Sequence, residues 1–260
     1  MSTIHHRSAR HTVEAILLGN TKCCPACQHK LKPTLKYFWC SHCRKKIYPK
    51  SLCWLRNSKL SYKQILVLLQ AWQKGLSPGS VKAHTSLSYP TIARWYGLFR
   101  VHLPDSDSVV LIGEVEADES FFGKQKYNNQ KIVIGAVERA SGRLRLRIIP
   151  DREQDTFEDF LLSSVDRTSL VSTDAHKSYE GIEWYGYLHW QSNHSIGQFR
   201  ETNRIEGTWS VIKRHIRRMY GQIRMSLLPQ LLVEFEARAN FKHLFKDCRS
   251  YLQVCLFRVL

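Results

Sequence analysis

The strongest constraint on the fold is a series of strand-like segments in the second half of the chain. Short apolar and β-branched runs predict strands at five places: residues 109–118, 131–138, 144–149, 170–173 and, more weakly, 187–191. A helical pattern at about 154–164 separates the third run from the fourth. Three successive strands followed by alternating helices and strands are typical of an α/β domain with a mixed sheet.

The first half of the chain has a different texture. A short helical pattern lies within residues 1–20, and residues 21–52 are rich in cysteine, lysine and aromatic residues. Residues 58–101 have helical periodicity, and a Pro- and Asp-containing stretch after them has the composition of a linker. We therefore expect an N-terminal helical segment, a cysteine-rich module and a helical module, followed by an α/β domain with C-terminal helices over 109–260.

The charge balance indicates a polyanionic partner. The chain has 39 Lys and Arg against 22 Asp and Glu, a net charge of +17. No apolar run approaches the roughly 18–20 residues that span a bilayer, and the first residues are not those of a secretion signal. We expect a cytoplasmic protein that binds nucleic acid, with no membrane partner.

Four of the eight cysteines form two CxxC pairs, Cys24 with Cys27 and Cys40 with Cys43. Four thiolates at this spacing can close a tetrahedral structural Zn²⁺ site, as in a zinc ribbon over residues 21–52. A reduced cysteine-rich loop or two disulfides are the alternatives. Cys23 is a possible substitute ligand, although its spacing to Cys27 breaks the CxxC pattern.

Residues 81–96 have the pattern of a helix-turn-helix. One helix ends near Thr85, and Ser88 can cap a second helix whose first turn contains Pro90. Polar residues near the start of that second helix are expected to face the major groove of DNA. These are Tyr89, Thr91 and Arg94. The alternative is a helical spacer without base contacts.

Three acidic residues stand in contexts that can serve one purpose. Asp118 and Asp174 each end a strand-like run, and Glu206 opens a basic helix over 203–218. Two carboxylates at strand ends and one on a helix can hold a pair of divalent metal ions, which clamp the attacking and leaving oxygens of a phosphodiester displacement. Taken singly, each Asp can also be a turn or helix-cap residue.

Glu206 has two interpretations. The segment 203–206 resembles a capping box, in which Glu206 would only bond the amide of the helix cap. Helix geometry also places Glu206 on a polar edge with Lys213, beside a buried apolar stripe. That edge can present a metal ligand followed by cations that bind phosphate.

Several of these motifs together resemble one known family. They are the two cysteine pairs, Glu114 to Ser120, Thr173-Asp174, Asn193-His194-Ser195, Asn203 to Lys213, and Glu234 to Asn240. The chain resembles the DDE transposases of the bacterial insertion-sequence group related to eukaryotic Merlin elements, the ISXO2-like group. The resemblance covers nearly the whole chain. It departs at Ala175 and Thr208, where the family often has Gly and Phe, and His176 has no clear counterpart.

The resemblance implies an RNase H-like catalytic domain in which Asp118, Asp174 and Glu206 bind Mg²⁺ or Mn²⁺. Lys213 corresponds to the basic residue that follows the acidic triad in this group. Arg214 and Arg217 extend the same basic surface toward DNA.

The expected function is that of a transposase. It would bind the terminal inverted repeats of an insertion sequence, cut the DNA, and join the 3′-hydroxyl ends to target DNA. We expect a homodimer or larger oligomer on double-stranded DNA, associated with the nucleoid. The alternatives are a non-catalytic DNA-binding regulator derived from such an enzyme and a structure-specific metal-dependent nuclease.

Overall fold

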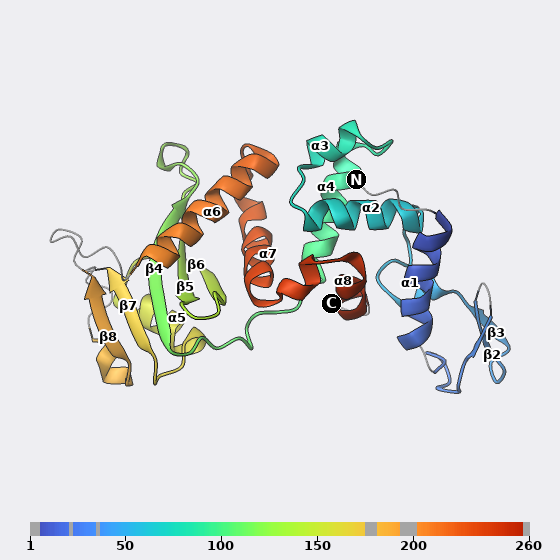
Figure 1. Cartoon of the computed structure of the whole chain (residues 1–260), viewed down its shortest axis with the longest axis horizontal. Coiled ribbons are helices and arrows are strands. Elements are labelled where there is room, and N and C mark those ends of the chain that lie inside the picture. The colour runs from blue at the N-terminus through green and yellow to red at the C-terminus, as the bar shows by residue number, and fades with distance from the viewer. Residues whose placement is uncertain (1–5, 21–22, 35–36, 175–180, 193–201, 257–260) are drawn as a thin grey trace. The chain divides into compact units, whose positions relative to one another are not determined.

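The chain forms two compact units. The computed structural model describes residues 6–20, 23–34, 37–174, 181–192 and 202–256 (Figure 1). The first unit comprises residues 1–104 and 243–260, and the second comprises residues 105–242. No helix among the described residues combines the length and apolar character needed to cross a membrane.

The first unit begins with α1 (His6–Asn20) and a small antiparallel sheet of three strands. These strands are β1 (Lys32–Pro33), β2 (Phe38–Cys40) and β3 (Lys45–Ile47), in that order across the sheet. The buried side chains of this small module include Leu31 and Phe38 together with Cys24 and Cys40. Cysteine therefore supplies much of the interior of a module that has little apolar residue content of its own.

Four further helices complete the first unit: α2 (Tyr62–Gln73), α3 (Pro78–Ala83), α4 (Tyr89–Val101) and α8 (Cys248–Cys255). Serine residues begin three of them. Ser61 forms a capping box with Gln64, and the hydroxyls of Ser77 and Ser88 accept the amides of Ser80 and Thr91. Each cap satisfies an amide that the first helical turn cannot pair internally.

The C-terminal residues 243–260 cluster with the first unit, whereas the sequence analysis placed them at the end of the α/β domain. Contacts made by α2 explain this. The side chain of Gln73 donates hydrogen bonds to the carbonyls of Leu244 and Asp247, at 2.6 and 2.8 Å. Trp72 packs against Phe245 and Tyr251. A helical pattern in the sequence carries no information on such long-range contacts.

The second unit contains a five-stranded mixed sheet in the order β6-β5-β4-β7-β8. The strands are β4 (Glu114–Phe122), β5 (Lys131–Glu138), β6 (Leu144–Ile149), β7 (Leu170–Asp174) and β8 (Leu188–Ser192). Strands β4, β5 and β6 pair antiparallel, and β7 and β8 continue the sheet parallel to β4. This confirms the predicted α/β fold class with the mixed sheet expected of an RNase H-like domain.

Helices cover both faces of the sheet. Helix α5 (Gln154–Ser164) buries Phe157, Phe160 and Leu161 on one face. Helices α6 (Asn203–Tyr220) and α7 (Leu228–Asn240) bury an apolar cluster on the other face (Figure 1). The α6 stripe comprises Ile205, Trp209, Ile212 and Ile216, as the helical periodicity predicts.

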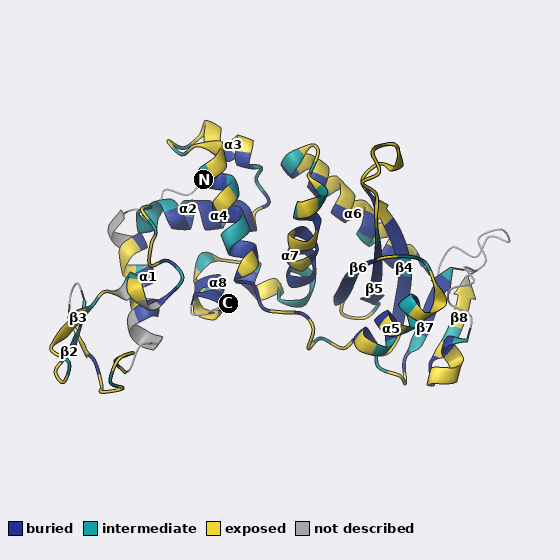
Figure 2. Ribbon diagram, turned by 180° about the vertical axis from the view of Figure 1, so that it is seen from behind, coloured by how far each residue is buried: buried dark blue, intermediate teal, exposed yellow. Residues whose placement is uncertain are grey.

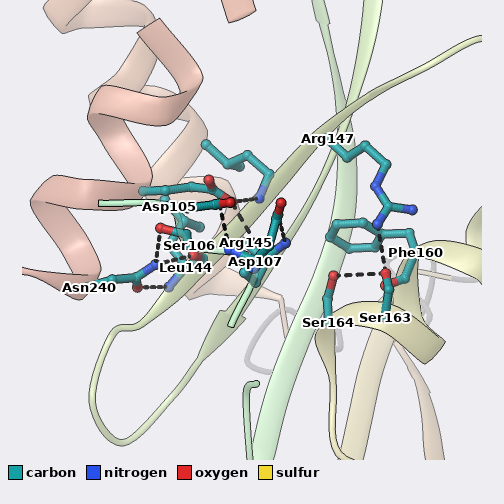
Figure 3. A network of polar contacts seen from close by, with 12 residues as sticks. Asp105, Ser106, Asp107, Leu144, Arg145, Arg147, Phe160, Ser163, Ser164 and Asn240 are labelled. Atoms are coloured by element: carbon teal, nitrogen blue, oxygen red, sulfur yellow. Dashed lines mark hydrogen bonds and ion pairs between the residues drawn. The ribbon is translucent and has the colours of Figure 1, made fainter. Parts of the chain in front are cut away.

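Side chains of α7 cover the free edge of the sheet. Asn240 accepts the amide of Leu144 and donates to the carbonyl of Leu144, both at 2.8 Å, and it also donates to Ser106 (Figure 3). One turn earlier, the Glu236 carboxylate accepts the amide of Leu146 at 2.6 Å. These bonds take the place of a neighbouring strand at Leu144 and Leu146, so the first half of the β6 edge is not open to another strand.

Candidate functional site

Asp118 on β4 and Asp174 on β7 lie on neighbouring strands at the same level of the sheet. The parallel pairing of β4 with β7 sets Glu116 opposite Ser172, so two residues further along each strand Asp118 and Asp174 become neighbours on the same face. Asp174 ends β7 as predicted. Asp118 does not end a strand, because the pairing of β4 with β5 continues to Phe122. Asp118 instead lies where β4 extends beyond its pairing with β7.

The surroundings of Asp118 disfavour its ionised form. Its carboxyl is partly buried, and burial is the largest cause that raises the pKa of Asp118 from 3.8 to about 7. The negative charges of Glu119 and Asp174 raise this pKa further. The indole N–H of Trp209 donates to Oδ2 of Asp118 at 3.0 Å and opposes the rise. A cation at this place would relieve the repulsion between the carboxylates.

A glycine makes room for the indole. Gly135 lies directly opposite Asp118 in the β4–β5 pair. A Cβ at Gly135 would meet the indole ring of Trp209 at 2.7 Å and Leu146 at 2.9 Å, which is too close for either. The absence of a side chain at Gly135 therefore lets Trp209 cross β5 and reach Asp118. The helical periodicity of α6 indicates only that Trp209 belongs to the apolar stripe, and no sequence pattern indicates a role for Gly135.

Glu116 fixes the start of α6 beside these carboxylates. Its side chain is fully buried, and Oε2 accepts the backbone amides of Arg204 and Ile205 at 2.7 and 2.9 Å. Arg139 approaches Oε1 with its Nε at 3.0 Å. A carboxylate at a helix N-terminus is favoured by the helix dipole. The only sequence signal for this role is that Glu116 shares a strand face with Asp118.

The capping box proposed for residues 203–206 is therefore replaced by a cap from another element. Thr202 occupies the N-cap position of α6, and its side chain makes no cap hydrogen bond. The Thr202 hydroxyl instead donates to Oε1 of Glu206 at 3.1 Å. The carboxylate of Glu206 lies in the first turn of α6, on an exposed residue.

The three predicted metal ligands are not gathered as closely as the cysteines. Among the described residues, the groups of three or more such side chains with all ligand atoms within 4.8 Å consist of cysteine and histidine. The acidic triad is therefore not at ligand distance as a set. Asp118 and Asp174 interact electrostatically across neighbouring strands, and Glu206 lies one helical turn before Trp209, which bonds Asp118.

The end of β7 is held by a chain of polar side chains. The Thr173 hydroxyl lies 2.9 Å from Nε2 of His189 on β8 and donates to the carbonyl of Asp174 at 2.8 Å. Nδ1 of His189 lies 3.0 Å from a carboxylate oxygen of Glu183. These contacts tie the strand that carries Asp174 to its neighbour and so limit the positions that Asp174 can take.

Helix α6 carries a basic outer face. Lys213, Arg214 and Arg217 are all exposed, and Figure 2 shows exposed residues along this helix. The Nζ atom of Lys213 lies 5.5 Å from the centre of the Phe122 ring at the end of β4. Lys213 is thus on the same exposed edge of α6 as Glu206, as the helical spacing predicts.

The four predicted zinc ligands meet in the first unit. The ligand atoms of Cys24, Cys27, Cys40 and Cys43 all lie within 4.8 Å of one another, which suits one tetrahedral Zn²⁺ ion. The backbone amide of Ala26 is the largest cause that lowers the pKa of Cys24 to about 7, which favours the thiolate.

The neighbours of this cluster differ in their placement. Cys23 is exposed and lies outside the group of four. His42 is exposed and stacks on His29, with ring centres 4.0 Å apart. Together with Cys27, these two histidines form a second group with ligand atoms within 4.8 Å.

The predicted DNA-reading residues lie at the start of α4. Tyr89 and Arg94 are exposed, and the hydroxyl of Thr91 lies 2.9 Å from that of Ser88 at the helix cap. Ile92, Trp95 and Phe99 are buried on the other side of the helix. The motif residues 175–176 and 193–195 lie outside the described residues.

Comparison with known proteins identifies one family. A family model described as "ISXO2-like transposase domain" matches residues 110–240. The matched segment covers every strand of the five-stranded sheet and both helices on its α6 face. It includes all three acidic residues and Lys213. No curated protein matches the chain.

Two solved structures are similar at low sequence identity. The catalytic core domain of BIV integrase is 16% identical, with a TM-score of 0.35, over 46% of this chain and 80% of that one. The simian T-cell lymphotropic virus intasome, in complex with PP2A regulatory subunit B56 gamma, is 11% identical. Its TM-score is 0.37, over 67% of this chain and 68% of that one.

Proposed function

Because the chain belongs to the family of ISXO2-like transposase domains, we propose that it cuts DNA at the ends of an insertion sequence and joins them to target DNA. The observation that carries this proposal is the pair of carboxylates at Asp118 and Asp174 on neighbouring parallel strands, beside the start of a basic helix. Acidic ligands next to a cationic surface suit a reaction on a phosphodiester.

The chemistry of the donor set suits divalent metal ions. Asp118, Asp174 and Glu206 are the residues that would hold Mg²⁺ or Mn²⁺, since hard cations prefer carboxylate oxygens. The raised pKa of Asp118 reflects crowded negative charge, which a bound cation would compensate. When bound, two such ions stabilise the attacking and leaving oxygens of a phosphodiester displacement.

The protein side chains position the reaction. Trp209 orients the carboxylate of Asp118, and Glu116 anchors the turn of α6 that carries Glu206. Lys213 lies on the same edge of α6 and would bind a phosphate beside the scissile bond. Hydrolysis would leave a 3′-hydroxyl, and its attack on the target strand would form one phosphodiester while breaking another. No covalent bond to the protein is needed.

The first unit would recognise the element ends. Its cysteine cluster would hold one structural Zn²⁺ through Cys24, Cys27, Cys40 and Cys43. Tyr89, Thr91 and Arg94, at the start of α4, would contact bases. In the second unit, Arg214 and Arg217 on α6 would bind DNA phosphates. A homodimer or larger oligomer would bring two element ends together on double-stranded DNA.

The test is strand cleavage by the full chain on a duplex that ends in the inverted repeats flanking the gene. Glu206→Gln should fold, bind this duplex and fail to cut it in Mg²⁺, because an amide is a poor Mg²⁺ ligand. The matched control is Glu153→Gln, which alters an exposed glutamate at the start of α5, on the opposite face of the sheet. Near-normal cleavage and joining by Glu206→Gln would overturn the assignment of Glu206 as the third metal ligand.

A further inference from the structure

The turn between β4 and β5 forms a basic hairpin that contains none of the proposed catalytic residues. Residues 123–131 are all exposed and include Lys124, Lys126 and Lys131 without any acidic residue. Figure 1 shows this hairpin projecting beyond the sheet beside α6. A protruding segment with three cations and no compensating carboxylate attracts a polyanion.

The hairpin has a defined shape. Gly123 has a φ of +87°, and a Cβ there would meet the carbonyl oxygen of Asn129 at 2.6 Å. The side chain of Asn129 accepts the amide of Lys124 at 2.9 Å. A short 3-10 turn, Gln125–Tyr127, then ends at Asn128 in the left-handed region, with a φ of 48°. These contacts and backbone angles define the conformation of the tip.

This turn presents an aromatic ring close to two cations. Tyr127 is 60% exposed. The Nζ atoms of Lys126 and Lys124 lie 4.8 and 5.8 Å from the centre of its ring. At an exposed site, each such cation–π contact contributes about 0.5–1 kcal/mol. An exposed ring flanked by lysines is also the combination with which proteins bind unpaired nucleic acid, through base stacking and phosphate contacts.

The base of the hairpin connects to the acidic residues. Phe122 precedes Gly123, and its ring contacts that of Trp209, with centres 6.1 Å apart. Trp209 donates to Asp118, and the Nζ atom of Lys213 lies 5.5 Å from the centre of the Phe122 ring. One short run of contacts thus leads from the carboxylate, past a cation on α6, to the hairpin.

We propose that the hairpin 123–131 binds the DNA strand adjoining the phosphate that is cut, with Tyr127 stacked on an unpaired base. Lys124 and Lys126 contact the phosphates on either side of that base. An unpaired base fits better than duplex DNA, since paired bases have both faces covered by their neighbours. The proposed transposase function enters this inference only in identifying the bound strand as the one next to the cut phosphate.

Equilibrium binding of the full chain to fluorescent dT20 and to a 20-base-pair duplex, without added Mg²⁺ or Mn²⁺, tests the role of Tyr127. Tyr127→Ala should weaken binding to dT20 by about tenfold, the typical loss of one stacked base, and leave duplex binding unchanged. Tyr127→Phe keeps the ring and should bind dT20 like the wild type. Trp184→Ala is the control, because Trp184 is 91% exposed and lies outside this hairpin.

Salt dependence tests the lysines. Replacing Lys124 and Lys126 by Gln should reduce the slope of log affinity against log salt for dT20 by about 1.4, the value for two phosphate contacts on a single strand. Equal dT20 affinity of Tyr127→Ala and wild type would overturn the proposal. A chain that binds dT20 through Tyr127 but cuts no DNA would refute the proposed function and leave the hairpin role standing.

Discussion

Trp209→Phe would test the coupling between α6 and the carboxylate of Asp118. The change removes the indole N–H that donates to Oδ2 at 3.0 Å and keeps an aromatic ring against Gly135. A hydrogen bond to a charged group contributes about 1.5–3 kcal/mol, and about 1.4 kcal/mol corresponds to one pKa unit. Because the bond favours the ionised form, its loss should raise the pKa of Asp118 further above its value of about 7.

The consequence is a pH-dependent loss of metal affinity. A divalent cation binds the ionised carboxyl. The metal affinity therefore falls with the ionised fraction when the pH is below the pKa, and it no longer depends on pH when the pH is well above the pKa. The ratio of wild-type to variant affinity should therefore be largest below pH 7, at about tenfold for each 1.4 kcal/mol lost, and should fall toward one as pH rises above the pKa of the variant. Titration of free Mn²⁺ by electron paramagnetic resonance measures this ratio.

A packing control separates the hydrogen bond from a general disturbance. Phe122→Leu alters the aromatic neighbour of Trp209 and keeps the N–H donor. It should lower the free energy of unfolding without changing how Mn²⁺ affinity depends on pH. Equal Mn²⁺ affinity of wild type and Trp209→Phe at pH 6.5, or a ratio that stays constant as pH rises, would refute the reasoning.

Three further predictions concern zinc, the start of α6 and the sheet edge. Elemental analysis should give about one zinc per chain, lost in Cys40→Ser and kept in Cys23→Ser. Glu116→Ala should lower the free energy of unfolding in urea by about 3 kcal/mol, since two backbone amides lose their acceptor, and Glu116→Gln should cost less. Burial raises the pKa of Glu236 from 4.5 to about 7. Between about pH 4.5 and 7, the native state therefore binds more protons than the unfolded state. The stability contributed by this carboxyl falls as pH rises through that range. Thermal melting of Glu236→Gln should lack that part of the pH dependence.

Local patterns predicted the elements of the second unit well. The expected strands 131–138 and 144–149 and the helix 154–164 coincide with β5, β6 and α5. Each is set by the period of its own apolar residues. The first strand was expected over 109–118 but runs over Glu114–Phe122, because its length depends on pairing with β5 rather than on its own composition.

The arrangement of the candidate site could be predicted less well than the strands and helices, because it depends on tertiary contacts. Asp118 and Asp174 were identified from the ends of apolar runs, yet only the β4–β7 register makes them neighbours. Glu116 and Gly135 were not assigned roles, since one acts on a helix 88 residues away and the other leaves space for the ring of Trp209. No local pattern contains such relations.

The way α6 begins bears on how Glu206 should be tested. A capping role would make Glu206 part of the stability of the helix, and loss of activity in a variant could then reflect a frayed first turn. The amides of Arg204 and Ile205 are instead accepted by Glu116, a buried residue of another element. The start of α6 therefore does not rest on a local capping box. Glu206→Gln should accordingly leave the free energy of unfolding close to that of the wild type, so a loss of cleavage can be assigned to chemistry.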